Sequence, residues 1–428
     1  METRMKKTEI LKQIAEVMSN DAACCKDKKD EVYHKYASLI NEEMSDNEFL
    51  LTVNSYLCTF GLTGHLFFKK QGNKGLPFRV QRYGDVLYVT EVTKDSPLSK
   101  GDKVVAINGG SVKDFYERYA ECFFGEIQER QTPYWNFILK YADQIGYVRV
   151  AEEEVEYWDV KLFDWISENA PYIFKKINPS VSYLRFEDFM DSDGIVSFLE
   201  ENDFEIRVTK NLVIDVRGNG GGNSFAYEPL LKYCLPKGKR LRDLDLAGNE
   251  TLWYGKETLY SERNCDVRIK IIEEMMQEGM LNGKEEFLKQ AVNELGDLRG
   301  KGFVKDLSGS DSDVIGGSDV ETVVVLTDSS CCSAGDGFVD LFKKLPKVKV
   351  FGRPTQGILD YADVAYVLFD EYALVYPTSR QLSLDYGKGM MGKGVAVDEY
   401  IAWTPEHLTR DVDLEYVLMK LNKLSNPN

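Results

Sequence analysis

The stretch ETVVVLTDSSCCSAGDGFVDLF, residues 321–342, decides the fold of this chain. Its first seven residues, ETVVVLT, centre on the apolar run VVVL, which predicts a buried strand. From Phe338 onward, apolar residues recur at the i, i+3, i+4 and i+7 positions, which predicts one face of a helix. A cluster of serines and cysteines lies between the two. The turn therefore places small nucleophilic side chains at the N-terminal end of a helix.

Ser333 stands directly before this predicted helix, and two interpretations stay open. As a cap, it would only satisfy the first N–H groups of the helix. As a nucleophile, it would have the Ala334 N–H and the positive helix end beside it, and both favour developing negative charge. A third interpretation makes Cys332 the nucleophile. The alternative for Cys332 is a small buried side chain beside the true nucleophile.

A second strand–loop–helix pattern, NLVIDVRGNGGGNSFAYEPLLKYC, occupies residues 211–234. A dinucleotide fingerprint would need glycine at position 223, where this chain has Asn223. A phosphate loop would end in GK[ST], which is absent. Three consecutive glycines, Gly220, Gly221 and Gly222, allow backbone N–H groups to approach a ligand closely, as an oxyanion hole requires. By itself, a tight turn between strand and helix explains the loop equally well.

A serine nucleophile needs a base, and the chain has only three histidines. His34 lies on a charged helix and His407 near the C-terminus, where a surface or structural role is the simpler interpretation. His65 lies in CTFGLTGHLFF, residues 58–68, where glycines interrupt an apolar run. It is the candidate base, with a satisfied core histidine as the alternative.

Composition excludes several classes of function. The 428 residues carry a net charge of −17, which argues against binding to nucleic acid or to an anionic membrane surface. The N-terminus lacks the apolar core of a signal peptide, and no run reaches the roughly 18 apolar residues of a membrane span. We therefore expect a cytoplasmic protein. Eight cysteines without CxxC spacing and three histidines give no basis for a metal site or a disulfide framework, and no cofactor is expected.

The secondary structure that the sequence predicts changes along the chain. Residues 1–60 read as helices, and Ser45 with Glu48 forms a capping-box pattern before an apolar run. Residues 73–110 read as short alternating strands with Gly, Asp and Pro turns. Strands alternate with helices after residue 180, which predicts an α/β core with substantial parallel pairing.

Residues 265–295 predict two further helices, broken at Asn282–Gly283. We interpret them as an insertion over the core. The residues expected to share one apolar face are Phe287, Leu288, Ala291, Val292 and Leu295.

These segments together resemble the superfamily of C-terminal processing (tail-specific) peptidases and tricorn protease. Five sequence motifs carry the resemblance and occur in the same order as in the family. They are LCTFGLTGHLFF (57–68), NLVIDVRGNGGGN (211–223), VVVLTDSSCCSAGDGF (323–338), GRPTQG (352–357) and GKGVAVD (392–398). The segments GLPF (75–78), GDVLYVTEV (84–92) and GDKVVAING (101–109) are similar to the pattern of a PDZ domain. The resemblance covers nearly the whole chain, less securely across 110–165 and 235–305.

The resemblance implies an α/β multidomain fold with a ClpP/crotonase-like β-α spiral as its catalytic core. It implies an N-terminal helical region at 1–72 carrying His65, a PDZ-like domain with an extension at 73–165, and a catalytic core at 166–428 with a helical insertion at about 235–305. The implied activity is that of a serine peptidase acting on peptides or unfolded proteins. Its oligomeric state is left open.

The resemblance also implies roles for single residues. Ser333 would be the nucleophile and His65 the base. The oxyanion would be held by the N–H groups of Ala334 and of the three-glycine segment. In the PDZ-like part, peptide binding would fall to Gly75, Leu76 and Phe78, although Pro77 removes one N–H from that turn.

Two departures from the family pattern concern the partner of the base. Ile358 stands where the Ser/Lys type carries its lysine, and Met391 stands where tricorn-like members often carry the glutamate that orients the histidine. Asp360 is the candidate replacement: if residues 356–362 are extended, its side chain points the same way as that of Ile358. A surface or turn aspartate is the alternative. A weak or inactive peptidase-like binding or scaffold protein on the same fold is the competing hypothesis.

Overall fold

The computed structural model describes residues 4–62, 64–125, 127–164, 170–244, 255–277, 285–307 and 312–425. The chain has a mixed α/β fold of several parts, as the sequence predicted, and it divides into two compact units. Unit 1 consists of Met1–Gly72, Trp253–Gly309 and Asp360–Gly389, and unit 2 consists of Asn73–Leu252, Ser310–Leu359 and Met390–Asn428. The domain boundaries at 72 and 165 stay a prediction.

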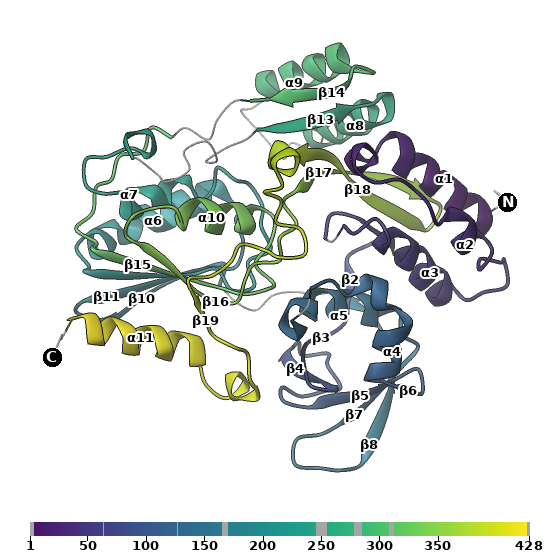
Figure 1. Ribbon diagram of the computed structural model, residues 1–428, viewed down its shortest axis with the longest axis horizontal. Helices are drawn as coiled ribbons and strands as arrows, with labels where there is room; N and C mark the ends of the chain where they lie inside the picture. Colours follow the sequence, from purple (N-terminus) through teal and green to yellow (C-terminus); the bar gives the residue numbers. More distant parts are fainter. Residues whose placement is uncertain are drawn as a thin grey trace. The chain divides into compact units, whose positions relative to one another are not determined.

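Unit 1 is built on an antiparallel five-stranded sheet (Figure 1). Strand β18 pairs with β17 on one side and with β1 and β13 on the other, while β14 pairs with β13. The strands are β1 (Phe67–Lys70), β13 (Lys256–Tyr260), β14 (Gly302–Asp306), β17 (Tyr361–Phe369) and β18 (Tyr372–Gln381). The helices before them are α1 (Lys7–Asn20), α2 (Tyr33–Ala37) and α3 (Asp46–Cys58). The capping box predicted for Ser45 and Glu48 starts α3 and is confirmed.

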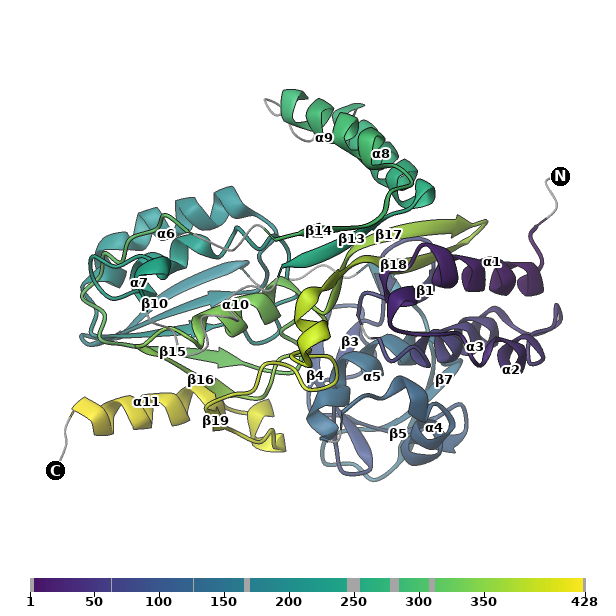
Figure 2. The ribbon, with the colours of Figure 1, turned by 45° about the horizontal axis from the view of Figure 1, so that its top comes forward.

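The predicted insertion contributes α8 (Glu262–Gln277) and α9 (Glu285–Leu298), which Figure 2 shows lying side by side. The predicted break at Asn282–Gly283 lies outside the described residues. Leu288 and Leu295 are buried, as their spacing predicted. Phe287 was placed on the same face, and that prediction is wrong: its side chain is 69% exposed. It precedes Leu288 by one residue, a step of about 100° around a helix, which turns it out of the contact.

Unit 2 contains a six-stranded sheet in the order β10-β11-β12-β15-β16-β19. All neighbours are parallel except β10 and β11. The strands are β10 (Tyr172–Asn178), β11 (Val181–Phe186), β12 (Asn211–Asp215), β15 (Thr322–Thr327), β16 (Val348–Gly352) and β19 (Glu399–Tyr400). The helices that cover the sheet are α6 (Ser192–Arg207), α7 (Leu231–Cys234), α10 (Ala334–Phe342) and α11 (Val412–Ser425).

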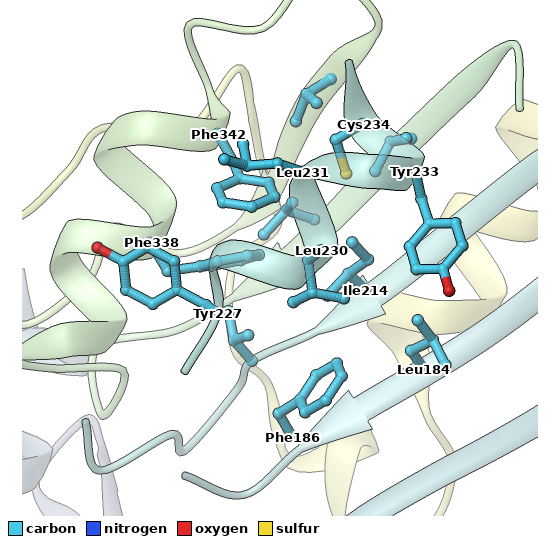
Figure 3. Packing of buried hydrophobic residues seen from close by; sticks show 14 of the residues in the cluster. Leu184, Phe186, Ile214, Tyr227, Leu230, Leu231, Tyr233, Cys234, Phe338 and Phe342 are labelled. Atoms are coloured by element: carbon cyan, nitrogen blue, oxygen red, sulfur yellow. The ribbon is translucent and has the colours of Figure 1, made fainter. Parts of the chain in front are cut away.

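The unbroken apolar run of β15 is explained by burial of the sheet on both faces. Val323 and Val325 belong to the core beneath α6, α7 and α10, whereas Val324 and Leu326 point to the opposite face, toward α11. Parallel strands covered on both faces need apolar residues at every position. Figure 3 shows the first core, where sheet residues and helix residues meet, among them Leu184, Phe186, Ile214, Leu230, Leu231, Phe338 and Phe342.

The remainder of unit 2 is an antiparallel sheet in the order β3-β4-β5-β7-β8, with β6 paired to β5. The strands are β3 (Phe78–Tyr83), β4 (Val86–Val92), β5 (Lys103–Ile107), β6 (Gly110–Ser111), β7 (Gln144–Val148) and β8 (Val155–Asp159). The short strands β2 (Lys74–Gly75) and β9 (Phe163–Asp164) pair separately, and the helices are α4 (Val112–Arg118) and α5 (Thr132–Ile138). The short alternating strands predicted for residues 73–110 are thus present.

Candidate active site

The glycine loop and the serine turn meet at one edge of the parallel sheet. They follow β12 and β15, which are neighbours, and the carboxyl ends of parallel strands lie at the same edge. Hydrogen bonds join the two segments directly: the Gly218 N–H donates to Asp328 Oδ1 at 2.9 Å, and the Cys332 N–H donates to the Asn219 carbonyl at 3.0 Å. The structure therefore brings together the two segments that sequence analysis singled out.

Ser333 is held in an unusual backbone conformation at the start of α10. Its φ is 56° and its ψ is −116°, a combination that non-glycine residues rarely adopt because it costs energy. A Cβ atom built on Gly221 would lie 2.7 Å from the Ser333 Cβ and 3.0 Å from the Ala334 nitrogen. Only glycine leaves room at position 221 for this approach.

Asp336 holds the serine turn in place, and sequence analysis did not identify it. Its carboxylate accepts hydrogen bonds from the Ser333 N–H at 2.8 Å, the Gly357 N–H at 2.7 Å and the Ile358 N–H at 2.9 Å. Burial raises the pKa of Asp336 to about 6, although these bonds and one from Thr355 act to lower it. The capping-box spacing Ser-x-x-Asp was the available signal.

The predicted oxyanion donors differ in what they already bind. The Gly220 N–H donates to the Glu187 carbonyl at 3.2 Å, and the Gly221 N–H donates to Asn219 Oδ1 at 2.9 Å. The N–H groups of Gly222 and Ala334 donate to no residue in the described part of the chain. Among the four predicted donors, the hydrogen bonds within the described residues therefore occupy Gly220 and Gly221 only, and the oxyanion role of all four stays a prediction.

Arg130 is a further residue that sequence analysis missed. It lies in the short helix Gln128–Gln131, within residues 110–165, where the family resemblance is less secure. Its guanidinium donates to the Thr355 carbonyl at 2.7 Å and to the Gln356 carbonyl at 2.9 Å. The Gln356 N–H in turn donates to the Cys331 carbonyl at 2.8 Å. Arg130 therefore fixes the GRPTQG segment, which supports the serine turn, and burial lowers its pKa.

His65 and Asp360 lie in unit 1. The His65 ring is half-buried, and its Nδ1 lies 2.6 Å from the Tyr361 carbonyl oxygen. Asp360 is buried, with its carboxylate against Gly389 and its carbonyl accepting from the Gln381 N–H at 2.8 Å. The role of Asp360 stays a prediction.

The extended conformation assumed for residues 356–362 is wrong. Residues 359–360 form a turn, and β17 begins only at Tyr361, where its pairing with Arg380 of β18 begins. Side-chain alternation between Ile358 and Asp360 therefore does not apply. Met391, at the position of the missing glutamate, lies in a turn of unit 2.

Cys332 is poorly suited to act as the nucleophile. Burial, together with the charges of Asp336 and Asp328, raises the pKa of the Cys332 thiol to about 12. The thiolate is the reactive form of cysteine, and at neutral pH this side chain stays protonated.

The residues predicted to bind a peptide in the PDZ-like part have structural contacts. Leu76 and Phe78 are buried, and Gly75 pairs with Phe163 in the β2–β9 ladder. The edge of β3 is also occupied: the Asn136 side chain accepts from the Val80 N–H at 2.8 Å and donates to the Val80 carbonyl at 3.1 Å. A peptide could pair with Val80 only by displacing Asn136.

No cluster of three or more His, Cys, Asp or Glu side chains suited to a metal ion occurs among the described residues. No helix in the described part of the chain combines the length and the apolar character that crossing a membrane requires.

Comparison with known proteins identifies the class of this protein, because a family model of serine-type peptidases matches the chain. That model, peptidase family S41, matches residues 180–401, more than half of the sequence. The chain belongs to peptidase family S41, so its substrates are peptides or proteins. No curated protein sequence matches the chain.

Solved structures share the fold. Mature CPAF complexed with lactacystin matches with a TM-score of 0.63 and 14% identity, over 98% of this chain and 98% of that chain. A second structure of mature CPAF matches with a TM-score of 0.60 and 13% identity, over 96% of this chain and 95% of that chain. Tricorn protease gives a TM-score of 0.45 and 16% identity, over 98% of this chain and 37% of that chain. At these identities the likeness concerns the fold alone.

Proposed function

We propose that this chain hydrolyses peptide bonds with Ser333 as nucleophile and His65 as general base. The observation that carries the proposal is the backbone of Ser333, a non-glycine residue held at a φ of 56° at the start of a helix. Such strained residues cluster at active sites, where the surrounding contacts must hold them. Here those contacts come from Asp336 and Gly221.

In the proposed reaction, Ser333 Oγ attacks the carbonyl carbon of the substrate while His65 takes the hydroxyl proton. The C–N bond then breaks, and His65 returns that proton to the departing amine. Water attacks the resulting acyl-enzyme by the same route, which releases the acid and restores Ser333. The oxyanion of each tetrahedral intermediate accepts hydrogen bonds from backbone N–H groups. Gly222 and Ala334 are the donors best supported by the hydrogen-bond pattern.

The contact of the His65 ring supports its role as base. A carbonyl oxygen can only accept, so the proton in the bond to Tyr361 lies on Nδ1. Nε2 then carries the lone pair that a general base needs. The segment GILDY, residues 357–361, contacts residues of both the serine turn and the base. The Ile358 N–H donates to Asp336, and the Tyr361 carbonyl, three residues later, binds the His65 ring. Asp360 lies between Ile358 and Tyr361 in the sequence, and we assign it to stabilise the imidazolium that forms on His65.

The finer features of the fold belong to the same proposal. The parallel order β11-β12-β15-β16 with helices on both faces supports a ClpP/crotonase-like core. The antiparallel sheet β3-β4-β5-β7-β8 with α4 and α5 supports a PDZ-like module. Recognition of a substrate C-terminus through Gly75, Leu76 and Phe78 would be the tail-specific mode of action, and it would require the peptide to displace Asn136 from the edge of β3.

Hydrolysis of a fluorescein-labelled unfolded protein tests the proposal with a matched pair of variants. Ser333→Ala should abolish turnover, whereas Cys332→Ala, one residue away, should retain most of it. His65→Ala should also lose turnover. Activity that survives Ser333→Ala would refute the assignment. A folded wild-type protein that binds the substrate without cleaving it would favour the alternative, a non-catalytic binding protein on this fold.

A further inference from the structure

Two large apolar side chains are exposed on the loops beside Ser333. Phe225 is 76% exposed and Met190 is 72% exposed, which makes them the most exposed large apolar residues in the described part of the chain. Single exposed apolar residues are ordinary on a protein surface. A pair on adjoining loops at a candidate active site calls for a separate explanation.

Hydrogen bonds hold the two loops together. The Asn223 N–H donates to the Phe189 carbonyl at 2.9 Å, and the Phe189 N–H donates to the Gly221 carbonyl at 2.8 Å. The Asn223 side chain also donates to Ser192 Oγ at 3.1 Å. Met190 follows Phe189 directly, and Phe225 is two residues beyond Asn223. Both side chains thus rise from a single fixed backbone arrangement.

The same arrangement lies against the serine turn. Gly221 packs on the Ser333 Cβ, and a Cβ built on the next residue, Gly222, would lie 2.7 Å from the Met190 nitrogen. The two exposed side chains therefore belong to loops whose backbones adjoin the proposed oxyanion donor Gly222. A substrate whose carbonyl is bound at this donor has its neighbouring side chains beside the same loops.

We propose that Met190 and Phe225 form the apolar wall that receives a substrate side chain next to the scissile bond. The inference rests on the proposed function and adds the substrate class: peptides with a large apolar residue, such as Leu, Met or Phe, at that position. Methionine suits such a wall because its flexible thioether adapts to different shapes. Phenylalanine offers a large contact area at a small cost in conformational entropy.

The charges around Met190 narrow the substrate class further. Glu187, Asp188, Asp191 and Asp193 surround it in the sequence, and Arg185, the nearest cationic residue in the sequence, is paired with Glu187 at 2.8 Å. The facing segment, residues 218–226, carries no charged residue. An acidic rim repels a substrate carboxylate and attracts a cation. Peptides with Lys or Arg beside the apolar residue are therefore favoured over peptides with Asp or Glu.

The test compares kcat/KM for internally quenched peptides in which the residue on either side of the scissile bond is Phe, Leu, Ala or Glu. The variants are Met190→Ser, Phe225→Ser and the double variant. Phe204→Ser on α6 and Met419→Ser on α11 are matched controls, because these side chains are 62% and 43% exposed in the same unit. The labelling rate with a fluorophosphonate bearing a short alkyl group reports on Ser333 without using the wall.

The double variant should lose about ten- to a hundredfold in kcat/KM for Phe and Leu peptides, the usual scale for apolar pocket contacts. Its Ala peptides should change by less than about threefold. The fluorophosphonate labelling rate should stay at the wild-type value in all variants, and the controls should keep the wild-type preference. Normal labelling with an unchanged preference in the double variant would overturn the inference alone. An equal loss in the control variants would do the same. A wild-type protein that neither reacts with the probe nor cleaves any peptide would overturn the proposed function and the inference together.

Discussion

Three of the four glycines in the loop after β12, namely Gly218, Gly220 and Gly221, allow the packing against Ser333 to be measured separately from backbone strain. Gly221 has a φ of +86°, and an added Cβ would meet the Ser333 Cβ, the Cys332 carbonyl at 2.8 Å and the Ala334 nitrogen. Gly218 has a φ of +75° but open space around it, and Gly220 has open space and lies outside the left-handed region. An alanine at 221 thus adds both backbone strain and a clash. An alanine at 218 adds backbone strain alone, and an alanine at 220 adds neither.

The magnitudes follow from the two costs. A left-handed conformation costs a non-glycine residue about 1–2 kcal/mol, and forcing an extra carbon into a packed site costs about 1–3 kcal/mol. Gly221→Ala should therefore lower the free energy of unfolding by about 2–5 kcal/mol. Gly218→Ala should lower it by about 1–2 kcal/mol, and Gly220→Ala should leave it within about 0.5 kcal/mol of wild type.

Urea denaturation measures these free energies, and fluorophosphonate labelling of the folded variants measures the state of Ser333. Because the clash lies on the serine turn, Gly221→Ala should also slow labelling by at least about tenfold, the rate equivalent of 1.4 kcal/mol. A Gly221→Ala protein as stable as Gly218→Ala, with labelling at the wild-type rate, would refute the close packing of the loop against Ser333.

Further predictions concern the residues that support the site. The pKa of Asp336 is raised to about 6, so its contribution to stability is fully present below about pH 4 and is lost as the pH rises through 6. The free energy of unfolding of wild type relative to Asp336→Asn should therefore fall between pH 4 and 7. A difference between the two proteins that is independent of pH would contradict this. Arg130→Met leaves the Thr355 and Gln356 carbonyls without their donor and should cost about 2–4 kcal/mol in urea denaturation, whereas the exposed Arg79→Met should cost less than about 0.5 kcal/mol. Asp360→Asn should lower kcat by a factor on the order of 10² to 10⁴; a kcat within about threefold of wild type would show that the orientation of His65 does not depend on this carboxylate.

The sequence pattern predicted the core of unit 2 because the relevant signals are local. The apolar run of β15 and the helical spacing after Phe338 each lie within a dozen residues, and both elements are present, although α10 ends at Phe342, before the i+7 position. The parallel pairing of β12 with β15 explains why the glycine loop meets the serine turn.

The supporting contacts depend on residues far apart in the sequence, and no local pattern encodes them. Asp336 shows a capping-box spacing, yet its bonds to Gly357 and Ile358 span more than twenty residues. Arg130 binds carbonyls more than two hundred residues away. The condition that residues 356–362 are extended fails at the turn 359–360. Nothing local marks this break, because GILDYADV carries no proline and its glycine lies before the turn.

The central claim is that Ser333 is the reactive nucleophile of this chain. Its most direct test is to react the folded wild-type protein with a fluorophosphonate and to locate the adduct by mass spectrometry of proteolytic fragments. We predict a single adduct on Ser333 and none on the Ser333→Ala variant. An adduct on Cys332, Ser329 or Ser330, or labelling that persists in Ser333→Ala, would contradict the account.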